Sequence, residues 1–334
     1  MVRLNERFEI GINMLRIIPV KKYLKVAKSL IANRIAGESV YPVYASFKLT
    51  RRCHFSCKFC NIKDNSAVDM STEKVKQILD NLSKSSVVLV SFEGGEPLLR
   101  PDIRELLQYA RSKNFYLLFT TSERKLERYP MKEFAEYIDF LHISIDEGHG
   151  NLEMLDRLKE YASYGTRLSI QIVVEKETLG ALENKVKLCY EAGANVVIMP
   201  AVQMDRTDNH FPDLEMFETE MKRLKRLYPY TTYTPDGYFN AVRKGICSTA
   251  SVVIGADGYL SYPCHIRDEK GPDLSQVDLM DWLKGEEAKS ARERMKNCGR
   301  NCGWFQYFSI SDFVTPAKVI DALRPLFKKH QSPK

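Results

Sequence analysis

Six apolar, strand-like runs alternate with helical patterns, and this alternation restricts the possible folds more than any other feature of the sequence. The runs cover residues 43–49, 87–92, 116–120, 140–145, 168–174 and 196–199. Helical patterns follow them at residues 72–82, 103–112, 131–137, 152–164, 182–192 and 214–227. Such an alternation predicts a parallel sheet with right-handed crossovers. Six β/α units are two fewer than an eightfold barrel needs, so we expect an α/β fold, either an open doubly wound sheet or a partial barrel.

The two ends of the chain do not continue the alternation of strands and helices seen in this central part. Residues 1–36 indicate two helical stretches broken near Pro19, and residues 230–237 suit a linker. Two short strands at 251–254 and 259–262 flank a turn, and helices are predicted at 279–295 and 317–329. We therefore divide the chain into an N-terminal helical extension (1–41), a core (42–230), a cysteine-bearing domain (231–310) and a C-terminal basic helix (311–334).

The composition places the chain among globular proteins. It is 44% hydrophobic and 28% charged, which excludes general disorder and a coiled coil. No apolar run approaches the roughly 20 residues that span a bilayer, and charges in the first ten residues exclude a signal peptide there. We expect a cytoplasmic protein.

The positive charge is concentrated at the two ends. Residues 1–34 hold eight Lys or Arg against two Asp or Glu, and residues 318–334 hold five against one. The body between them has no basic excess, so a nucleic-acid partner is not expected. In the second N-terminal stretch, Tyr23, Ala27, Leu30 and Ile31 share one helical face while most lysines lie off it. This stripe suits peripheral contact with an anionic membrane or packing against the protein body, and the spacing favours packing.

The eight cysteines form two groups and one isolated residue. Cytosolic thiols stay reduced, so metal ligation explains the groups better than disulfides do. Cys53, Cys57 and Cys60 directly follow the first predicted strand. Three thiolates can hold three irons of a [4Fe–4S] cluster and leave the fourth iron open, whereas a zinc site would need a fourth ligand such as His54. Cys189 lies in a predicted helix and is expected in the core.

The first cysteine group resembles the signature of the radical S-adenosylmethionine (radical SAM) enzymes. The resemblance rests on Cys-x3-Cys-x2-Cys, with Phe59 before the last cysteine and Leu49-Thr50 before the first. It implies a partial (β/α)6 TIM-type barrel over residues 42–230 and catalytic roles for Cys53, Cys57 and Cys60. It also implies that an electron from the cluster cleaves SAM to methionine and a 5′-deoxyadenosyl radical, which takes hydrogen from an unactivated carbon. A ferredoxin- or flavodoxin-type reductant is expected.

The resemblance extends to the ends of the next strands. Gly94, Gly95, Glu96 and Pro97 match the family's Gly-Gly-Glu-Pro motif, which contacts the SAM amino group. Phe59, Thr121, Ser144 and Asp146 are the further candidates for contact with SAM, although Ser144 and Asp146 could equally cap strand ends. Weaker candidates are His142, which could also be a satisfied core histidine, Gln171 and Gln203. The family's Arg-containing segment after Asp146 is replaced here by Glu-Gly-His-Gly.

The second cysteine group resembles the SPASM/twitch extension of the same family. Cys247, Gly258 and Cys264 follow its opening pattern loosely, and Cys298 and Cys302 complete a set of four. The resemblance implies one auxiliary [4Fe–4S] cluster with every iron ligated by protein, which would relay electrons or stabilise the domain. A Zn(Cys)4 site is the alternative, and His265 could replace one cysteine.

The substrate is the least constrained feature. The basic amphipathic ends favour a membrane lipid or isoprenoid, with hydrogen abstraction or adenosyl transfer at an unactivated carbon. Modification of a peptide or protein side chain, the commonest activity of SPASM/twitch enzymes, is the alternative. Cofactor biosynthesis on a nucleotide or haem-like substrate is a third possibility, and a non-enzymatic iron–sulfur carrier is a fourth.

Overall fold

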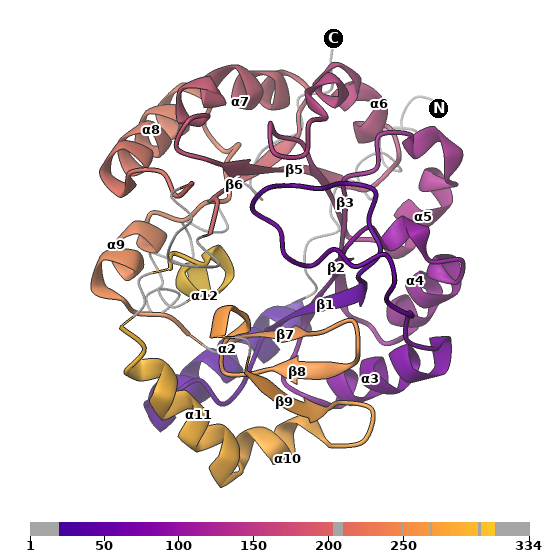
Figure 1. Cartoon of the computed structure of the whole chain (residues 1–334), viewed down its shortest axis with the longest axis vertical. Helices are drawn as coiled ribbons and strands as arrows, with labels where there is room; N and C mark the ends of the chain where they lie inside the picture. The colour runs from indigo at the N-terminus through magenta and orange to yellow at the C-terminus, as the bar shows by residue number, and fades with distance from the viewer. Residues whose placement is uncertain (1–19, 203–209, 249, 268, 300–301, 311–334) are drawn as a thin grey trace, which may run out of the picture.

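The computed structural model describes residues 20–202, 210–248, 250–267, 269–299 and 302–310. All six predicted strands and the helical segments that follow them are present (Figure 1). The strands are β1 (Tyr44–Thr50), β2 (Leu89–Gly94), β3 (Tyr116–Thr121), β4 (Phe140–Ser144), β5 (Arg167–Val174) and β6 (Asn195–Pro200). The helices are α3 (Thr72–Lys84), α4 (Ile103–Ser112), α5 (Met131–Tyr137), α6 (Leu158–Ala162), α7 (Leu182–Glu191) and α8 (Leu214–Leu227).

These helices cover the outer face of a curved sheet (Figure 1). Helix α3 shows why: its buried residues Val75, Ile78, Leu79 and Leu82 recur at helical spacing. Ser71 caps its first turn by accepting a hydrogen bond from the backbone N–H of Lys74. The predicted helix 152–164 differs in its first half, which forms a 3-10 turn (η3, Leu152–Arg157) before α6 begins.

The sheet is a partial barrel that does not close. Its strand order is β6-β5-β4-β3-β2-β1-β7-β8-β9. The pairs from β6 to β1 are all parallel, and β7 (Ser251–Ile254) also pairs with β1 in parallel. The helices lie outside and the inner face is turned away from them, so the doubly wound alternative is wrong (Figure 1).

The C-terminal region is built onto the edge of this barrel. Strands β8 (Tyr259–Ser261) and β9 (Lys270–Asp273) extend β7 as antiparallel neighbours. The single helix predicted at 279–295 is wrong: Gly285, in extended conformation, separates α10 (Leu279–Lys284) from α11 (Glu286–Lys296). The short elements β9, α9 (Gly237–Lys244) and α12 (Phe305–Ile310) lack clear signals in the sequence. The predicted helix 317–329 lies outside the described residues.

Helix α2 (Val20–Ala36) is present, but its orientation differs from the prediction. Lys22, Ser29 and Asn33 are buried, whereas Leu24 and Ile31 are exposed by 64% and 59%. Ala27 is also exposed, and the side chain of Tyr23 is not among those that the structure describes. The prediction that this apolar face packs against the protein body is therefore wrong. The polar face packs against the barrel because it forms hydrogen bonds there: the Lys25 ammonium donates to the carbonyl of Val87, 3.1 Å away.

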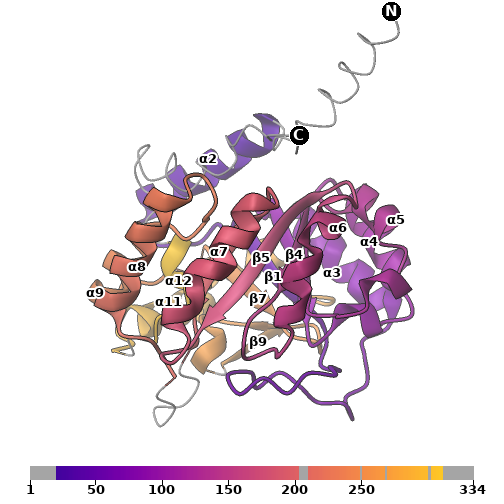
Figure 2. The ribbon, with the colours of Figure 1, turned by 90° about the horizontal axis from the view of Figure 1, so that it is seen from above.

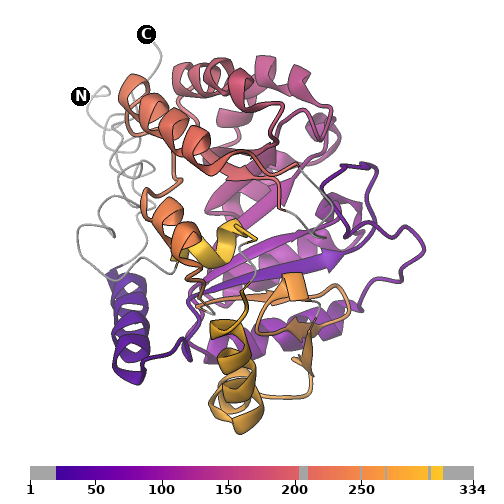
Figure 3. The ribbon, with the colours of Figure 1, turned by 60° about the vertical axis from the view of Figure 1, so that its left-hand side comes forward.

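The position of α2 separates it from the cysteine loop. Figure 2 shows α2 at one end of the barrel and the loop between β1 and α3 at the opposite end, and Figure 3 shows α2 beside the barrel rather than within it. Among the described helices, none combines the length and the apolar character needed to cross a bilayer.

A buried arginine joins the segment after α2 to the C-terminal region. Arg292 on α11 is 4% exposed and donates to both carboxylate oxygens of Glu38, at 2.8 and 3.2 Å. It also donates to the Tyr262 hydroxyl and the Leu283 carbonyl. The boundaries proposed at residues 41 and 230 are thus crossed by an ion pair and by the pairing of β1 with β7.

Candidate active site

The loop after β1 carries the first three cysteines at the carboxyl end of the barrel strands. Cys53 and Cys57 are half-buried and Cys60 is exposed. The loop is held by its own backbone: the N–H of Cys60 donates to the Cys57 carbonyl at 3.1 Å, and the N–H of Phe55 donates to Cys53 Sγ at 3.4 Å. Burial, with smaller contributions from neighbouring thiols, raises the pKa of Cys53 to about 11.

This donor set fits an iron–sulfur cluster better than a single ion. The loop supplies three cysteines, one fewer than the four ligands that a closed zinc site needs. Zinc draws its thiolates to about 2.3 Å from one centre, whereas each thiolate of a [4Fe–4S] cluster binds a different iron. His54, the alternative zinc ligand, is engaged elsewhere, because its Nε2 lies 2.7 Å from a carboxylate oxygen of Glu123.

The Gly94-Gly95 pair lies directly against the cysteine loop. The Gly95 N–H donates to the Thr50 carbonyl and the Glu96 N–H donates to the Arg52 carbonyl, both at 2.8 Å. A β-carbon on Gly94 or Gly95 would overlap these backbone carbonyls, and Gly94 has φ +138°, so glycine is required at both positions. The motif therefore fixes the start of the cysteine loop, whether or not it also contacts SAM.

Glu96 ties the ends of β2 and β3 together. Its carboxylate accepts from the Thr121 hydroxyl at 2.8 Å and from the backbone N–H groups of Ser122 and Leu98 at 2.9 and 3.1 Å. Pro97 follows as the first residue of a 3-10 turn (η1, Pro97–Leu99). Burial raises the pKa of Glu96 to about 7 despite these donors. Both Glu96 and Thr121 are thus already partnered within the protein.

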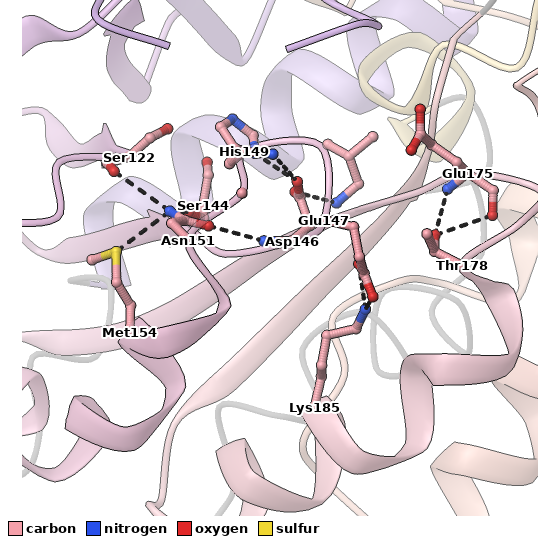
Figure 4. A network of polar contacts seen from close by, with 12 residues as sticks. Ser122, Ser144, Asp146, Glu147, His149, Asn151, Met154, Glu175, Thr178 and Lys185 are labelled. Atoms are coloured by element: carbon pink, nitrogen blue, oxygen red, sulfur yellow. Dashed lines mark hydrogen bonds and ion pairs between the residues drawn. The ribbon is translucent and has the colours of Figure 1, made fainter. Parts of the chain in front are cut away.

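Asp146 organises the turn that follows β4 (Figure 4). It is fully buried and accepts from the backbone N–H of His149 at 2.9 Å and of Val173 at 3.0 Å. Asn151 completes the turn by donating to the Ser144 carbonyl at 2.8 Å. These bonds make Asp146 a structural cap, the alternative anticipated for it, while contact of Ser144 or Asp146 with SAM stays a prediction.

His149 connects this turn to the cysteine loop, and the sequence analysis assigned it no role. Its Nδ1 lies 2.7 Å from Asp146, and its ring packs on Phe59 with centroids 5.5 Å apart. Burial opposes the charge of the ring, but hydrogen bonds to Asp146 and Cys57 raise its pKa to about 10. The only signal in the sequence was its place three residues after Asp146. The structure thus puts a cationic donor beside one of the three candidate iron ligands.

A row of polar side chains crosses the inner face of the sheet, and we call it the polar row. It consists of Lys48, Glu93, Thr120, His142, Ser169 and Asn195, one from each of β1 to β6. Strand register aligns them: Lys48 with Glu93, Thr120 with His142, His142 with Ser169, and Ser169 with Asn195. Within each strand, the residues directly before and after the row member point to the helices, and most of them are apolar. The row lies just below the Gly94–Pro97 loop.

The row contains a balanced ion pair and a neutral histidine. Lys48 Nζ lies 2.6 Å from Glu93 Oε2, and the pair is largely shielded from solvent. Burial lowers the pKa of His142 to about 4, so its ring is neutral at physiological pH. His142 stacks on Phe140 with centroids 5.3 Å apart, but its Nδ1 has no hydrogen-bond partner. It is therefore not the satisfied core histidine of the alternative interpretation. Gln171 is half-buried on the same face, and Gln203 lies outside the described residues.

The four later cysteines converge in the C-terminal region. Burial raises the pKa of Cys247 to about 12, and the thiols of Cys264, Cys302 and Cys298 add to the rise, so the four lie within electrostatic reach of one another. Tyr307 packs against Cys264 in a small apolar cluster. Its hydroxyl accepts from the backbone N–H of His265 at 3.1 Å, while the His265 ring packs beside Trp304. Cys189 is fully buried in α7, as predicted.

Comparison with known proteins identifies the family. A sequence profile of the Radical SAM superfamily matches residues 47–217. Mycofactocin maturase MftC of Mycolicibacterium smegmatis is 26% identical over 199 residues, which cover 55% of this chain and 50% of that protein. PqqA peptide cyclase of Bradyrhizobium diazoefficiens is 24% identical over 178 residues, with 48% and 47% covered. The chain thus matches about half the length of these relatives.

Solved structures share the fold at low sequence identity. SuiB of Streptococcus suis bound to the precursor peptide SuiA has a TM-score of 0.62 at 16% identity, with 78% of this chain and 68% of that chain covered. The anSMEcpe structure with bound AdoMet has a TM-score of 0.61 at 16% identity, with 80% and 88% covered. Because the family profile covers half of the sequence, the chain belongs to the Radical SAM superfamily.

Proposed function

We propose that the protein modifies a peptide or protein side chain, which was the alternative to a lipid substrate. MftC and PqqA peptide cyclase, two of its relatives, are named as a maturase and a peptide cyclase. The observation that carries the proposal is the polar row, because an isoprenoid or acyl chain against it would leave buried polar atoms without partners. A peptide offers hydrogen-bonding groups to such a wall.

The residues present would hold the cofactors in distinct places. Cys53, Cys57 and Cys60 would each ligate one iron of the first cluster and leave the fourth iron for SAM. The residues expected around SAM are Phe59, Gly94, Gly95, Glu96, Pro97, Thr121, Ser144 and Asp146. When bound, the cluster and SAM supply a 5′-deoxyadenosyl radical that removes hydrogen from the substrate. The protein's own part is to orient the substrate on the inner face and to exclude water there.

Cys247, Cys264, Cys298 and Cys302 would ligate an auxiliary [4Fe–4S] cluster. Arg267 supports this assignment because the raised pKa of its guanidinium stems from hydrogen bonds to Glu269 and Cys298. A fully ligated cluster has no open iron for substrate, so an electron-relay or stabilising role fits best. A ferredoxin- or flavodoxin-type protein would supply electrons.

Anaerobic reconstitution followed by mass spectrometry tests the proposal. We expect about eight irons per chain, SAM cleavage to 5′-deoxyadenosine with dithionite, and a mass change in a peptide that accelerates this cleavage. SAM cleavage would exclude an iron–sulfur carrier. Acceleration by a tetrapyrrole instead of a peptide would favour cofactor biosynthesis, since Fe-coproporphyrin III synthase of Methanosarcina barkeri is 30% identical over 104 residues.

One observation favours the lipid alternative. The exposed Leu24, Ile31 and Ile35 on α2 lie near Lys28 and Arg34, a pattern that suits an anionic membrane surface. However, α2 lies at the end of the barrel opposite to the cysteine loop, so a membrane held there would be far from the candidate active site (Figure 2). Flotation with anionic vesicles tests the contact itself: Leu24→Ser with Ile31→Ser should abolish it, and equal flotation of this variant would refute it.

A further inference from the structure

The centre of the polar row contains three neighbouring polar atoms without partners. Thr120 Oγ1, His142 Nδ1 and Ser169 Oγ are buried and form no hydrogen bond. They lie side by side, because His142 is in register with Thr120 on β3 and with Ser169 on β5. Ser169 is completely buried and His142 is 5% exposed. A buried polar group without a partner is costly, so three adjacent ones indicate a place where ordered water or a bound molecule supplies the missing bonds.

The surroundings restrict the charge of that molecule. Lys48 and Glu93 neutralise each other, and the Tyr44 hydroxyl donates to Glu93 at 3.3 Å. The row therefore offers no unpaired charge to a ligand. A carboxylate or ammonium placed beside His142 would be buried without a counter-ion, which is strongly unfavourable.

The chemistry of the three atoms restricts the ligand further. Two hydroxyls can donate or accept, and a neutral imidazole nitrogen does one or the other according to its tautomer. An aliphatic group would leave all three unsatisfied. A hydroxyl, a phenol or a carboxamide both donates and accepts, so it can bond to two or three of them at once.

The position of the three atoms connects them to the reaction. Glu93 directly precedes Gly94, Thr120 directly precedes Thr121, and His142 lies two residues before Ser144. The row therefore lies close in the chain to residues proposed to surround SAM, and His142 shares the inner face of β4 with Ser144.

We propose that Thr120, His142 and Ser169 form a recognition site for an uncharged hydrogen-bonding side chain of the substrate peptide. The inference rests on the proposed function, since it names the class of side chain that the enzyme selects. The three residues are positioning residues: they hold the side chain and leave the reaction to the cofactor. Specificity then follows from the penalty for leaving these atoms unpaired.

A binding experiment tests the site without turnover. The probes are acetylated, amidated heptapeptides of one backbone whose central residue is asparagine, serine, tyrosine, leucine, aspartate or lysine. Equilibrium dialysis against the anaerobic holoenzyme with SAM and no reductant gives dissociation constants. We expect at least one of the asparagine, serine and tyrosine peptides to bind at least about tenfold more tightly than the leucine, aspartate and lysine peptides.

Variants attribute the preference to the three residues. Thr120→Val, His142→Phe and Ser169→Ala should each reduce it, and Ser169→Ala is the mildest change should His142→Phe fold poorly. Tyr161→Phe is the matched control, because Tyr161 also carries a buried hydroxyl without a partner but belongs to α6 on the outside of the barrel. It should bind the peptides as the wild type does.

The possible outcomes separate the two proposals. Preference for a charged or aliphatic peptide, no preference, no binding, or a preference that survives all three substitutions would each overturn the recognition site. In the last case the atoms would hold only ordered water. Addition of dithionite then tests the proposed function: peptides bound with the expected preference but never modified would refute peptide modification alone, and modification without preference would refute the recognition site alone.

Discussion

The Asp146 carboxylate lies 2.7 Å from Nδ1 of His149, and this contact holds the imidazole against the cysteine loop. The same ring contacts the Cys57 thiol and packs on Phe59. The turn after β4 and the loop after β1 are therefore in contact, although Cys57 and His149 are 92 positions apart in the sequence.

His149→Ala should lower the reduction potential of the cluster bound at Cys53, Cys57 and Cys60. A cationic hydrogen-bond donor beside a ligating thiolate stabilises the more negative, reduced cluster, so its removal makes reduction harder. A potential titration followed by electron paramagnetic resonance measures the shift. His54→Ala is the control, since this half-exposed ring on the same loop pairs with Glu123 instead. Equal potentials in His149→Ala and the wild type would contradict the assignment.

Gly148→Ala should reduce the iron content of the reconstituted protein. A β-carbon at Gly148 would overlap the ring of Phe59, which must then shift together with the cysteine loop. Gly180→Ala is a matched control, because a β-carbon there meets nothing within 4 Å. Iron and sulfide analysis compares the two. Full iron content in Gly148→Ala would mean that the loop tolerates the displacement.

The two cysteine groups should fail in different ways. Cys57→Ala should abolish SAM cleavage, because an iron of the SAM-binding cluster loses its ligand. Cys298→Ala should retain some uncoupled SAM cleavage but lose stability or product formation. Cys189→Ala, in the core of α7, should keep all cluster properties. Quantifying 5′-deoxyadenosine and iron in the three variants checks this, and full activity of Cys57→Ala would show that the site is misassigned.

The sequence predicted the barrel well because its signals are repeated and local. The spacing of Val75, Ile78, Leu79 and Leu82 on α3 defines a buried helical face without knowledge of any other segment. The polar row was not predicted as a unit, although His142 was noted, because its members are far apart in the chain and only strand register brings them together. The break at Gly285 was missed because an isolated glycine is tolerated within a helical pattern and so does not by itself predict a break.

Helix α2 shows where periodicity misleads. Ile31 belongs to the more apolar face, yet that face is exposed and Asn33 is buried. Asn33 explains why this face is buried: its side chain accepts from the backbone N–H of Tyr41 at 2.8 Å and donates to the Tyr41 carbonyl at 2.9 Å. Such specific bonds to the backbone of the segment after the helix leave no periodic trace in a sequence.

His142 should make stability depend on pH. Its pKa is about 4 in the folded protein and about 6.5 when unfolded, so the unfolded chain binds the extra proton. The contribution is constant above pH 6.5, and stability is lost as pH falls from about 6.5 to about 4. His142→Phe should flatten this part of the profile. Denaturant unfolding of the cluster-free proteins measures the difference, and parallel profiles would place His142 in contact with solvent.

Arg292→Ala should destabilise the protein by roughly 2 to 4 kcal/mol, because it removes a buried cation and leaves Glu38, the Tyr262 hydroxyl and the Leu283 carbonyl without their donor. Arg294→Ala on the same helix should cost less than about 1 kcal/mol, because its pair with Glu269 is exposed. Thermal unfolding compares the two. Equal melting temperatures would show that the Arg292 contacts contribute little.

The pairing of β7 with β1 has a consequence for how this enzyme can be dissected. A fragment that stops after α8 would keep every β/α unit but would uncover the backbone of β1, the strand that leads into the cysteine loop. An exposed strand edge has unpaired backbone N–H and C=O groups, which can pair with another polypeptide. Such a fragment should self-associate through β1. In the whole chain, the C-terminal cysteine region covers this edge and should thereby prevent self-association of the β/α units.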